Sequence, residues 1–215
     1  MDPDEFVRRN TAIAAPPLVP EMRLHLATKV TPIWQATETS LAKDGLPPPF
    51  WSFAWSGGQA LARYVLDNPE VVRGHEVLDI GSGSGIVAIA AAKAGAARVI
   101  AADIDHFAAA AIALNAQLNS VTVKVETRDL LDRVAAGWGV VLAGDICYEE
   151  PMSSRAIRLL RRIAARGRLA LLGDPGRAYL PKNDLVERAR YQVPTSRELE
   201  AGEMTESVVW QVLAE

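Results

Sequence analysis

The central part of the chain alternates short apolar runs with stretches of helical pattern. Apolar runs bounded by turn residues predict strands at 76–80, 98–103, 121–127, 139–145 and 168–173. The stretches between them predict helices at 85–94, 106–117, 131–136 and 152–165. Strands that alternate with helices are joined by right-handed crossovers, so we expect a parallel sheet covered by helices on both faces.

The two ends of the chain follow other patterns. The β-rich segments 188–193 and 206–213 predict a final hairpin, which brings the expected sheet to seven strands, mostly parallel with an antiparallel C-terminal pair. Toward the N-terminus, the pattern predicts a short strand at 22–27 and helices at 33–41 and 59–66. The fold class is therefore α/β.

An aromatic cluster joins the N-terminal part to the rest of the chain. Consecutive prolines at 47–49 form a stiff, extended lead into it. Its aromatic residues are Phe50, Trp51, Phe53 and Trp55. The first three are expected to fill a core, whereas the last opens the 59–66 helix and is expected to lie over the carboxyl end of the sheet. We place a boundary here, between an N-terminal extension, residues 1–55, and an α/β domain, residues 56–215.

A glycine-rich loop follows the first central strand. Gly81, Gly83 and Gly85 stand at alternate positions, directly before an alanine-rich helix. Glycines allow the backbone to turn sharply and to approach a ligand, and the helix aims its first N–H groups into the loop. A dinucleotide-binding loop needs glycine where Ile86 stands, and a P-loop needs Gly-Lys-Ser/Thr, which is absent. A nicotinamide-linked oxidoreductase is thus disfavoured, and an ordinary strand-to-helix turn is the structural alternative.

The pattern Asp79-x-Gly81-x-Gly83-x-Gly85 resembles motif I of the class I S-adenosylmethionine (SAM) methyltransferases. This resemblance implies a Rossmann-like class I methyltransferase fold with SAM as cofactor. Asp103 ends the next parallel strand, where a carboxylate can accept hydrogen bonds from both ribose hydroxyls. Asp129 follows strand 121–127, where it would meet the adenine edge, with Leu130 beside it to pack on the ring. Aspartates after strands also commonly cap the next helix, which is the alternative for both.

Composition excludes several classes of protein. Hydrophobic residues make up 49% of the 215 residues and charged residues 23%, as in an ordinary globular chain. The net charge of −3 offers no sign of the basic surface that nucleic-acid binding normally needs. Charged residues interrupt the only long apolar region, so no segment is expected to span a membrane.

A single cysteine, Cys147, excludes an intrachain disulfide framework and indicates a reducing compartment. Cysteine clusters that could hold zinc are excluded by the same count, and no metal is expected. Residues 1–5 carry three acids, which fits neither a secretory signal nor an arginine-rich transit peptide. We therefore expect a cytoplasmic protein.

The loop after strand 139–145 carries the candidate acceptor site. Methyltransferases that act on DNA bases or protein amides have Asn/Asp-Pro-Pro-Tyr in this place, and those prolines are missing here. The pattern Asp145-x-x-Tyr148 is instead similar to the Asp/Glu-x-x-Tyr/Phe motif of a family of protein lysine methyltransferases.

Longer stretches together resemble the electron-transfer flavoprotein β-subunit lysine methyltransferases. These stretches are 48–61, 67–69, 77–85, 102–105, 144–148, 173–177 and 179–181. Ser56, where proline is expected, and Cys147, where a bulkier residue is expected, depart from the family pattern.

The resemblance implies residue roles. The implied SAM site comprises Trp55, Asp79, Gly81, Ser82, Gly83, Gly85, Asp103, Asp129, Leu130 and Gly144. Asp145 and Tyr148 would form the lysine channel, the protein substrate would be the flavoprotein β-subunit, and the enzyme would act as a monomer.

Methyl transfer to an amine needs alignment and desolvation more than it needs a strong base. A carboxylate with an ordinary pKa of about 3.9 is a weak base, so Asp145 is expected to capture and aim the amine. Tyr148 is expected to line the channel and to make a cation–π contact. Three alternatives stay open: a SAM-binding module without activity, a small-molecule amine methyltransferase, and an enzyme for another protein such as a ribosomal protein.

Overall fold

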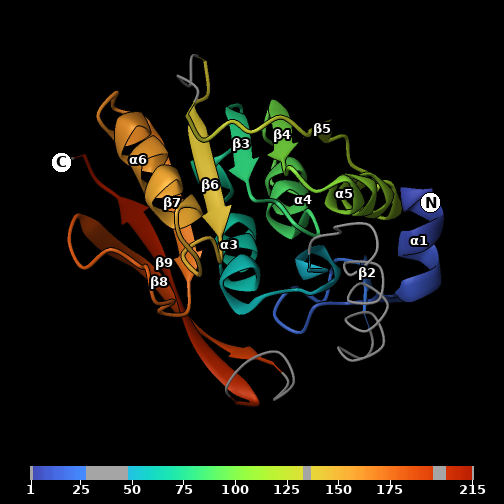
Figure 1. The fold of residues 1–215 in the computed structure, drawn as a ribbon. Coiled ribbons are helices and arrows are strands. Elements are labelled where there is room, and N and C mark those ends of the chain that lie inside the picture. The colour runs from blue at the N-terminus through green and yellow to red at the C-terminus, as the bar shows by residue number, and fades with distance from the viewer. Residues whose placement is uncertain (1, 28–47, 133–136, 196–201, 215) are drawn as a thin grey trace.

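The computed structural model describes residues 2–27, 48–132, 137–195 and 202–214 (Figure 1). Its main feature is a seven-stranded sheet in the order β5-β4-β3-β6-β7-β9-β8. The strands are β3 (Glu76–Ile80), β4 (Arg98–Ala102), β5 (Lys124–Glu126), β6 (Val140–Gly144), β7 (Leu169–Asp174), β8 (Leu185–Pro194) and β9 (Met204–Val212). Strands β3 to β7 are parallel, and β9 runs antiparallel to both β7 and β8. The expected fold class is confirmed.

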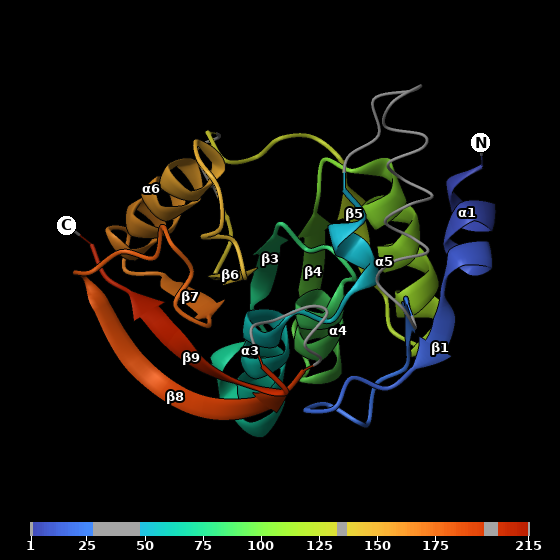
Figure 2. The ribbon, with the colours of Figure 1, turned by 60° about the horizontal axis from the view of Figure 1, so that its bottom comes forward.

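Helices cover both faces of the sheet, as Figures 1 and 2 show. The helices of the domain are α3 (Ser56–Asp67), α4 (Ile86–Lys93), α5 (His106–Leu118) and α6 (Met152–Ala164). Because side chains alternate along a strand, Val77 joins the core under α3, α4 and α5, whereas Leu78 joins the core under α6. The same alternation on the neighbouring strands produces two apolar layers around one sheet.

The N-terminal segment packs on α5. Helix α1 (Pro3–Asn10) precedes the short antiparallel pair β1 (Ala12–Ala14) and β2 (Leu24–Leu26). The Phe6 ring lies 4.7 Å from the Phe107 ring of α5. The His25 N–H donates to the buried Asn115 side chain at 2.7 Å, and that side chain donates to the Ser84 carbonyl of the glycine loop at 2.8 Å. The proposed boundary after residue 55 stays a prediction.

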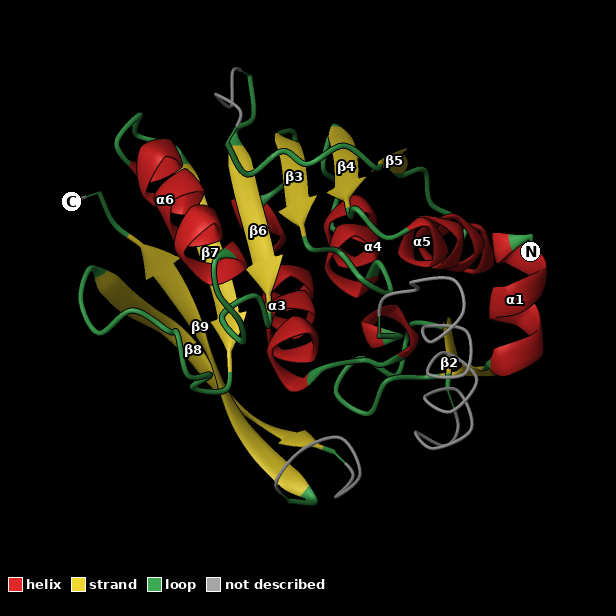
Figure 3. Cartoon of the chain, in the orientation of Figure 1, coloured by secondary structure: helices red, strands yellow, loops and turns green. Residues whose placement is uncertain are grey.

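Some elements differ from those the sequence predicts (Figure 3). The strand expected at 121–127 is limited to Lys124–Glu126, because β5 is the sheet edge and pairs only with β4. Residues 131–132 form a turn where a helix was expected at 131–136. The rest of that range lies outside the described residues, as does the helix expected at 33–41.

Helix α3 begins three residues before its predicted start and places two glycines in its first turn. Sequence reasoning misses this start because glycine is a poor helix former. The packing explains it: a Cβ on Gly57 would lie 2.7 Å from Asp145 Oδ2, and a Cβ on Gly144 would lie 2.9 Å from Gly58 Cα. The start of α3 therefore rests almost backbone to backbone on β6 and β7. In the part of the chain described, no helix combines the length and apolar character needed to cross a bilayer.

Candidate active site

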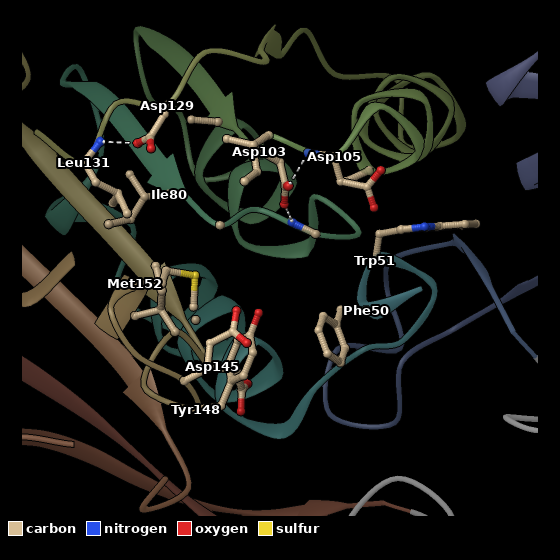
Figure 4. Close-up of a pocket in the computed structure, with 18 of the residues that line it drawn as sticks. Phe50, Trp51, Ile80, Asp103, Asp105, Asp129, Leu131, Asp145, Tyr148 and Met152 are labelled. Atoms are coloured by element: carbon tan, nitrogen blue, oxygen red, sulfur yellow. Dashed lines mark hydrogen bonds between the residues drawn. The ribbon is translucent and has the colours of Figure 1, made fainter. Parts of the chain in front are cut away.

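A cavity of about 690 Å³ opens at the carboxyl ends of β3, β4 and β6 (Figure 4). This volume lies within the range of about 300–1,000 Å³ that is typical of small-molecule sites. The predicted residues that line it are Trp55, Gly81, Gly83, Asp103, Asp129, Leu130, Gly144, Asp145 and Tyr148. Asp103 lies on one side of the space, with Asp145 and Tyr148 across it. The structure thus brings the predicted cofactor and acceptor residues to one cavity.

Three predicted residues, Asp79, Ser82 and Gly85, shape the glycine loop without lining the cavity. Asp79 Oδ2 accepts hydrogen bonds from Ser82 Oγ at 2.5 Å and from Ala88 N in the first turn of α4 at 3.1 Å. Burial raises the pKa of Asp79 to about 7. Gly81 adopts a φ of +60°, a left-handed conformation that suits glycine. These contacts fix the loop so that Gly81 and Gly83 border the cavity.

Asp103 holds the loop and faces the cavity with the same carboxylate. Its Oδ2 accepts from Gly83 N at 2.8 Å, and its Oδ1 accepts from Asp105 N at 3.0 Å. Burial raises the pKa of Asp103. Each carboxylate oxygen has a second lone pair, so both can accept a further hydrogen bond from a ligand. Figure 4 shows the Asp103 carboxylate at the edge of the cavity, with dashed lines to two backbone N–H groups.

Asp129 borders the cavity beside Leu130, and both of its carboxylate oxygens accept hydrogen bonds from the protein. Its Oδ1 accepts from Leu131 N at 3.0 Å, and its Oδ2 accepts from Arg155 of α6 at 2.8 Å. Asp129 therefore caps the local backbone, as the alternative interpretation expects, and it also borders the cavity. Leu130, which is buried, supplies the apolar surface beside it. Sequence reasoning did not anticipate Arg155, because its partner lies 26 residues away.

Asp145 is buried at the end of β6, in a left-handed conformation with φ of +53°. Its Oδ2 accepts from Gly58 N, in the first turn of α3, at 2.8 Å. Its Oδ1 accepts from Arg177 Nη2 at 2.8 Å and from Arg177 Nε at 3.2 Å. Burial raises the pKa of Asp145 to about 6, while the nearby guanidinium acts in the opposite direction. Asp145 thus forms an ion pair with Arg177, a partner that the sequence analysis does not predict.

Aromatic side chains form the cavity wall near Asp145. The Phe50 ring lies 5.3 Å from the Tyr148 ring and 6.1 Å from the Trp55 ring. Trp51 and Phe53 are buried as expected, although Trp51 also borders the cavity. The prediction for Phe50 is wrong, because its side chain is only half-buried and borders the cavity. The signal available was the position of this residue at the end of the proline run, beside Trp55.

The chemistry of the lining suits SAM. A glycine loop without bulky side chains, a carboxylate at the end of the next strand and an apolar wall match a nucleoside, and acidic groups match a sulfonium cation. In the described residues, no cluster of three or more His, Cys, Asp or Glu side chains is arranged to hold a metal ion.

The chain is similar to known methyltransferases in sequence and in fold. Residues 59–147 match the family model of the ribosomal protein L11 methyltransferase. The solved structure of an L11 methylase from Lactobacillus delbrueckii has a TM-score of 0.52 and 22% identity, over 79% of this chain and 83% of that one. Magnesium protoporphyrin IX methyltransferase from Synechocystis, solved with SAM, has a TM-score of 0.53 and 19% identity, over 72% and 77%. The fold is that of the class I methyltransferases.

Closer relatives cover nearly the whole chain. The electron transfer flavoprotein beta subunit lysine methyltransferase of Xenopus laevis is 37% identical, over 97% of this chain and 86% of the relative. The Homo sapiens protein of the same name is 36% identical, over 98% and 82%. The chain belongs to the electron transfer flavoprotein beta subunit lysine methyltransferase family. The resemblance and the enzyme class expected from the sequence are confirmed, while the individual residue roles stay predictions.

Proposed function

We propose that this protein transfers methyl groups from SAM to lysine side chains of the electron transfer flavoprotein beta subunit. Family membership supports the choice of substrate. One feature of the site supports methyl transfer as the reaction. The glycine loop with Asp103 and the loop with Asp145 and Tyr148 border the same cavity, so a cofactor and an acceptor amine would meet there. The cofactor is SAM, which supplies an electrophilic methyl group on a sulfonium.

The cofactor half of the cavity is formed by β3 and β4. Gly81 and Gly83 leave room for the ligand beside the backbone, and Asp103 offers a lone pair on each oxygen to the ribose hydroxyls. Leu130 packs against the adenine ring in this arrangement. Asp129 has a free lone pair on each oxygen in addition to its bonds to Leu131 and Arg155, which suits an exocyclic amine.

The acceptor half is formed by the loop after β6. Asp145 orients the amine, and the rings of Phe50 and of Tyr148, which is partly exposed, flank its path. A lysine with the ordinary pKa of about 10.4 is protonated at neutral pH, and its deprotonation costs roughly 4 to 5 kcal/mol there. Transfer from water to an apolar channel lowers the pKa of an amine, so the channel itself promotes loss of the proton.

We further propose that the protein works in the cytoplasm as a monomer. A buried, free Cys147 as the single cysteine of the chain supports a reducing compartment. The cavity is lined by one chain, so a single copy supplies every group assigned above.

The test uses purified electron transfer flavoprotein, this protein and isotopically labelled SAM, followed by peptide mapping by mass spectrometry. We expect labelled lysines in the beta subunit and loss of label when the mapped lysines are changed to arginine. A reaction without this protein is the control. Absence of any modified lysine would reject the proposal.

The match of residues 59–147 to the L11 methyltransferase model supports a ribosomal protein as the second candidate. Incubation with labelled SAM and a cell extract separates the candidates. Label on a ribosomal protein favours the second candidate, and label on a small molecule favours a metabolite amine.

A further inference from the structure

Arg177, in the loop after β7, is held in the cavity by contacts on three sides. Its Nη2 lies 2.8 Å from Asp145 Oδ1, and its guanidinium carbon lies 5.6 Å from the centre of the Trp55 ring. Its backbone N–H donates to Asp174 Oδ1 at 2.7 Å. The side chain is 23% exposed, so the ion pair is largely removed from water. This arrangement fixes a permanent cation at the centre of the acceptor half.

We propose that Arg177 is a positioning residue for methyl transfer, whose guanidinium balances the charge of Asp145 so that the carboxylate aims the acceptor amine without retaining its proton. The inference rests on the proposed lysine methylation.

Arg177 changes how the charge of Asp145 acts on the pKa of the acceptor amine. A carboxylate beside an ammonium stabilises the charged form and raises the pKa of the amine, which opposes reaction. Arginine stays protonated at all relevant pH values, so the Asp145–Arg177 pair carries no net charge. The pair can still accept an N–H of a neutral amine through Oδ2, which accepts one bond from Gly58, whereas Oδ1 already accepts two bonds from Arg177.

The bonds change as follows under this arrangement. The ammonium loses one proton to water, and the freed nitrogen lone pair forms the new N–C bond. The C–S bond breaks, and its electron pair stays on sulfur. Arg177 and Asp145 exchange no proton in these steps, which fits a guanidinium and a paired carboxylate.

Other charged and titratable groups around Asp145 are acidic or neutral. They are Asp174 at the end of β7, Cys147, Tyr148, Glu149 and Glu150 in the loop after β6, and Asp103 across the cavity. The first turn of α3 faces Asp145 with the backbone N–H of Gly58. The other arginines of the cavity are paired elsewhere, Arg128 with Glu126 and Arg155 with Asp129 and Asp132. Loss of the Arg177 charge would therefore leave Asp145 among other acids.

The first experiment measures the pKa of Asp145 directly, in protein without cofactor. Carboxyl carbons of labelled aspartate are followed by NMR across pH, and the Asp145 signal is assigned by its absence in Asp145→Asn. An opposite charge at this distance shifts a pKa by about 1 to 3 units, so Arg177→Gln should raise the pKa of Asp145 by about that amount. Arg177→Lys keeps the charge and should leave the pKa near the wild-type value.

The second experiment measures kcat and KM across pH with electron transfer flavoprotein beta subunit and SAM. The kcat profile reports groups in the bound complex, including the acceptor amine. In Arg177→Gln, the limb that reports amine deprotonation should move to higher pH, so kcat at neutral pH should fall. Arg168→Gln, an exposed arginine at the opposite end of β7, is the matched control and should behave like wild type.

A uniform loss of kcat at every pH, with the pKa of Asp145 unchanged, would overturn the inference and leave Arg177 a structural role only. An equal shift in Arg177→Lys would also overturn it, because charge would not be the cause. If Arg177→Gln does not fold, Arg177→Met, which can still pack on Trp55, carries both measurements. A wild-type protein that methylates no lysine rejects the proposed function instead, whatever the NMR titration shows.

Discussion

Asp103 shows how one side chain can serve both the fold and a ligand. Its two oxygens hold the backbone at Gly83 and Asp105 and still face the cavity. A substitution therefore removes ligand contacts and loop support together, and the choice of variant decides which effect is seen.

Asp103→Ala should weaken SAM binding by roughly thirtyfold to a thousandfold. Loss of two hydrogen bonds to a charged acceptor costs about 2 to 4 kcal/mol, and 1.4 kcal/mol is about tenfold in affinity. Calorimetric titration with SAM measures the change, and circular dichroism checks the fold. Asp103→Asn keeps an acceptor oxygen and should lose less affinity. Unchanged affinity in folded Asp103→Ala would remove this residue from the cofactor site.

Asp145→Asn should reduce turnover roughly thirtyfold to a hundredfold and leave SAM binding near wild type. The amide keeps the shape of the carboxylate but removes an ionic hydrogen-bond partner, which costs about 2 to 3 kcal/mol, and leaves Arg177 as an unbalanced cation beside the amine. Labelled methyl transfer and calorimetry give the two quantities separately. Wild-type activity would refute the acceptor role, and lost SAM binding would place the residue in the cofactor site.

At the scale of elements, the site depends on the close contact between α3 and the ends of β6 and β7. A Cβ on Gly173 would collide with the Gly57 carbonyl, and one on Gly144 would approach Gly58. This contact aims the first N–H groups of α3 at Asp145, where the positive end of the helix stabilises an anion. The glycines of this helix thus position the acceptor site.

The sequence predicts the strands, their parallel direction and the acids at their ends, because apolar periodicity and strand ends are local features. It does not predict Arg177 or the Gly58 contact, because their partner Asp145 lies 32 and 87 residues away. It misplaces Phe50, since an aromatic residue has the same local pattern in a core and at a cavity wall. It overextends β5, because edge position is a property of the whole sheet.

The buried Asp79 under the glycine loop should make stability fall as pH rises from about 4 to about 7. Its pKa rises from 3.8 to about 7 on folding, so the unfolded chain ionises first and is stabilised relative to the folded chain across this window. The difference between the two pKa values corresponds to a loss of roughly 4 kcal/mol in the free energy of unfolding, and this loss stays constant at higher pH. Asp79→Asn should lack this component.

Urea unfolding of wild type and Asp79→Asn at several pH values between 4 and 8 measures the difference in slope. Subtracting the slope of Asp79→Asn from that of wild type removes the contributions of the other acids, which are common to both proteins. Glu70→Gln changes an exposed acid and serves as control, with a slope like that of wild type. Parallel slopes for wild type and Asp79→Asn would show that Asp79 folds with an ordinary pKa.

At the scale of the whole molecule, charge should govern how the protein substrate arrives. The chain carries a net charge of −3, and acids gather at the cavity, where Asp105 and Glu149 border it and Glu150 adjoins it. An excess of acidic over basic side chains attracts a basic segment over long range and raises the rate of encounter. A lysine stem is long enough to enter the channel while the rest of the target stays outside.

Methylation of the flavoprotein should therefore slow as salt rises. We expect kcat/KM to fall and kcat to change little. The Debye length falls from about 10 Å at 0.1 M salt to about 3 Å at 1 M, which screens attraction between exposed charges. Glu149→Gln should flatten the dependence of kcat/KM on salt. Glu70→Gln, which removes the same charge at the amino end of β3, should keep the wild-type slope. Equal slopes in both variants would mean that overall charge, and not the acids at the cavity, guides the substrate.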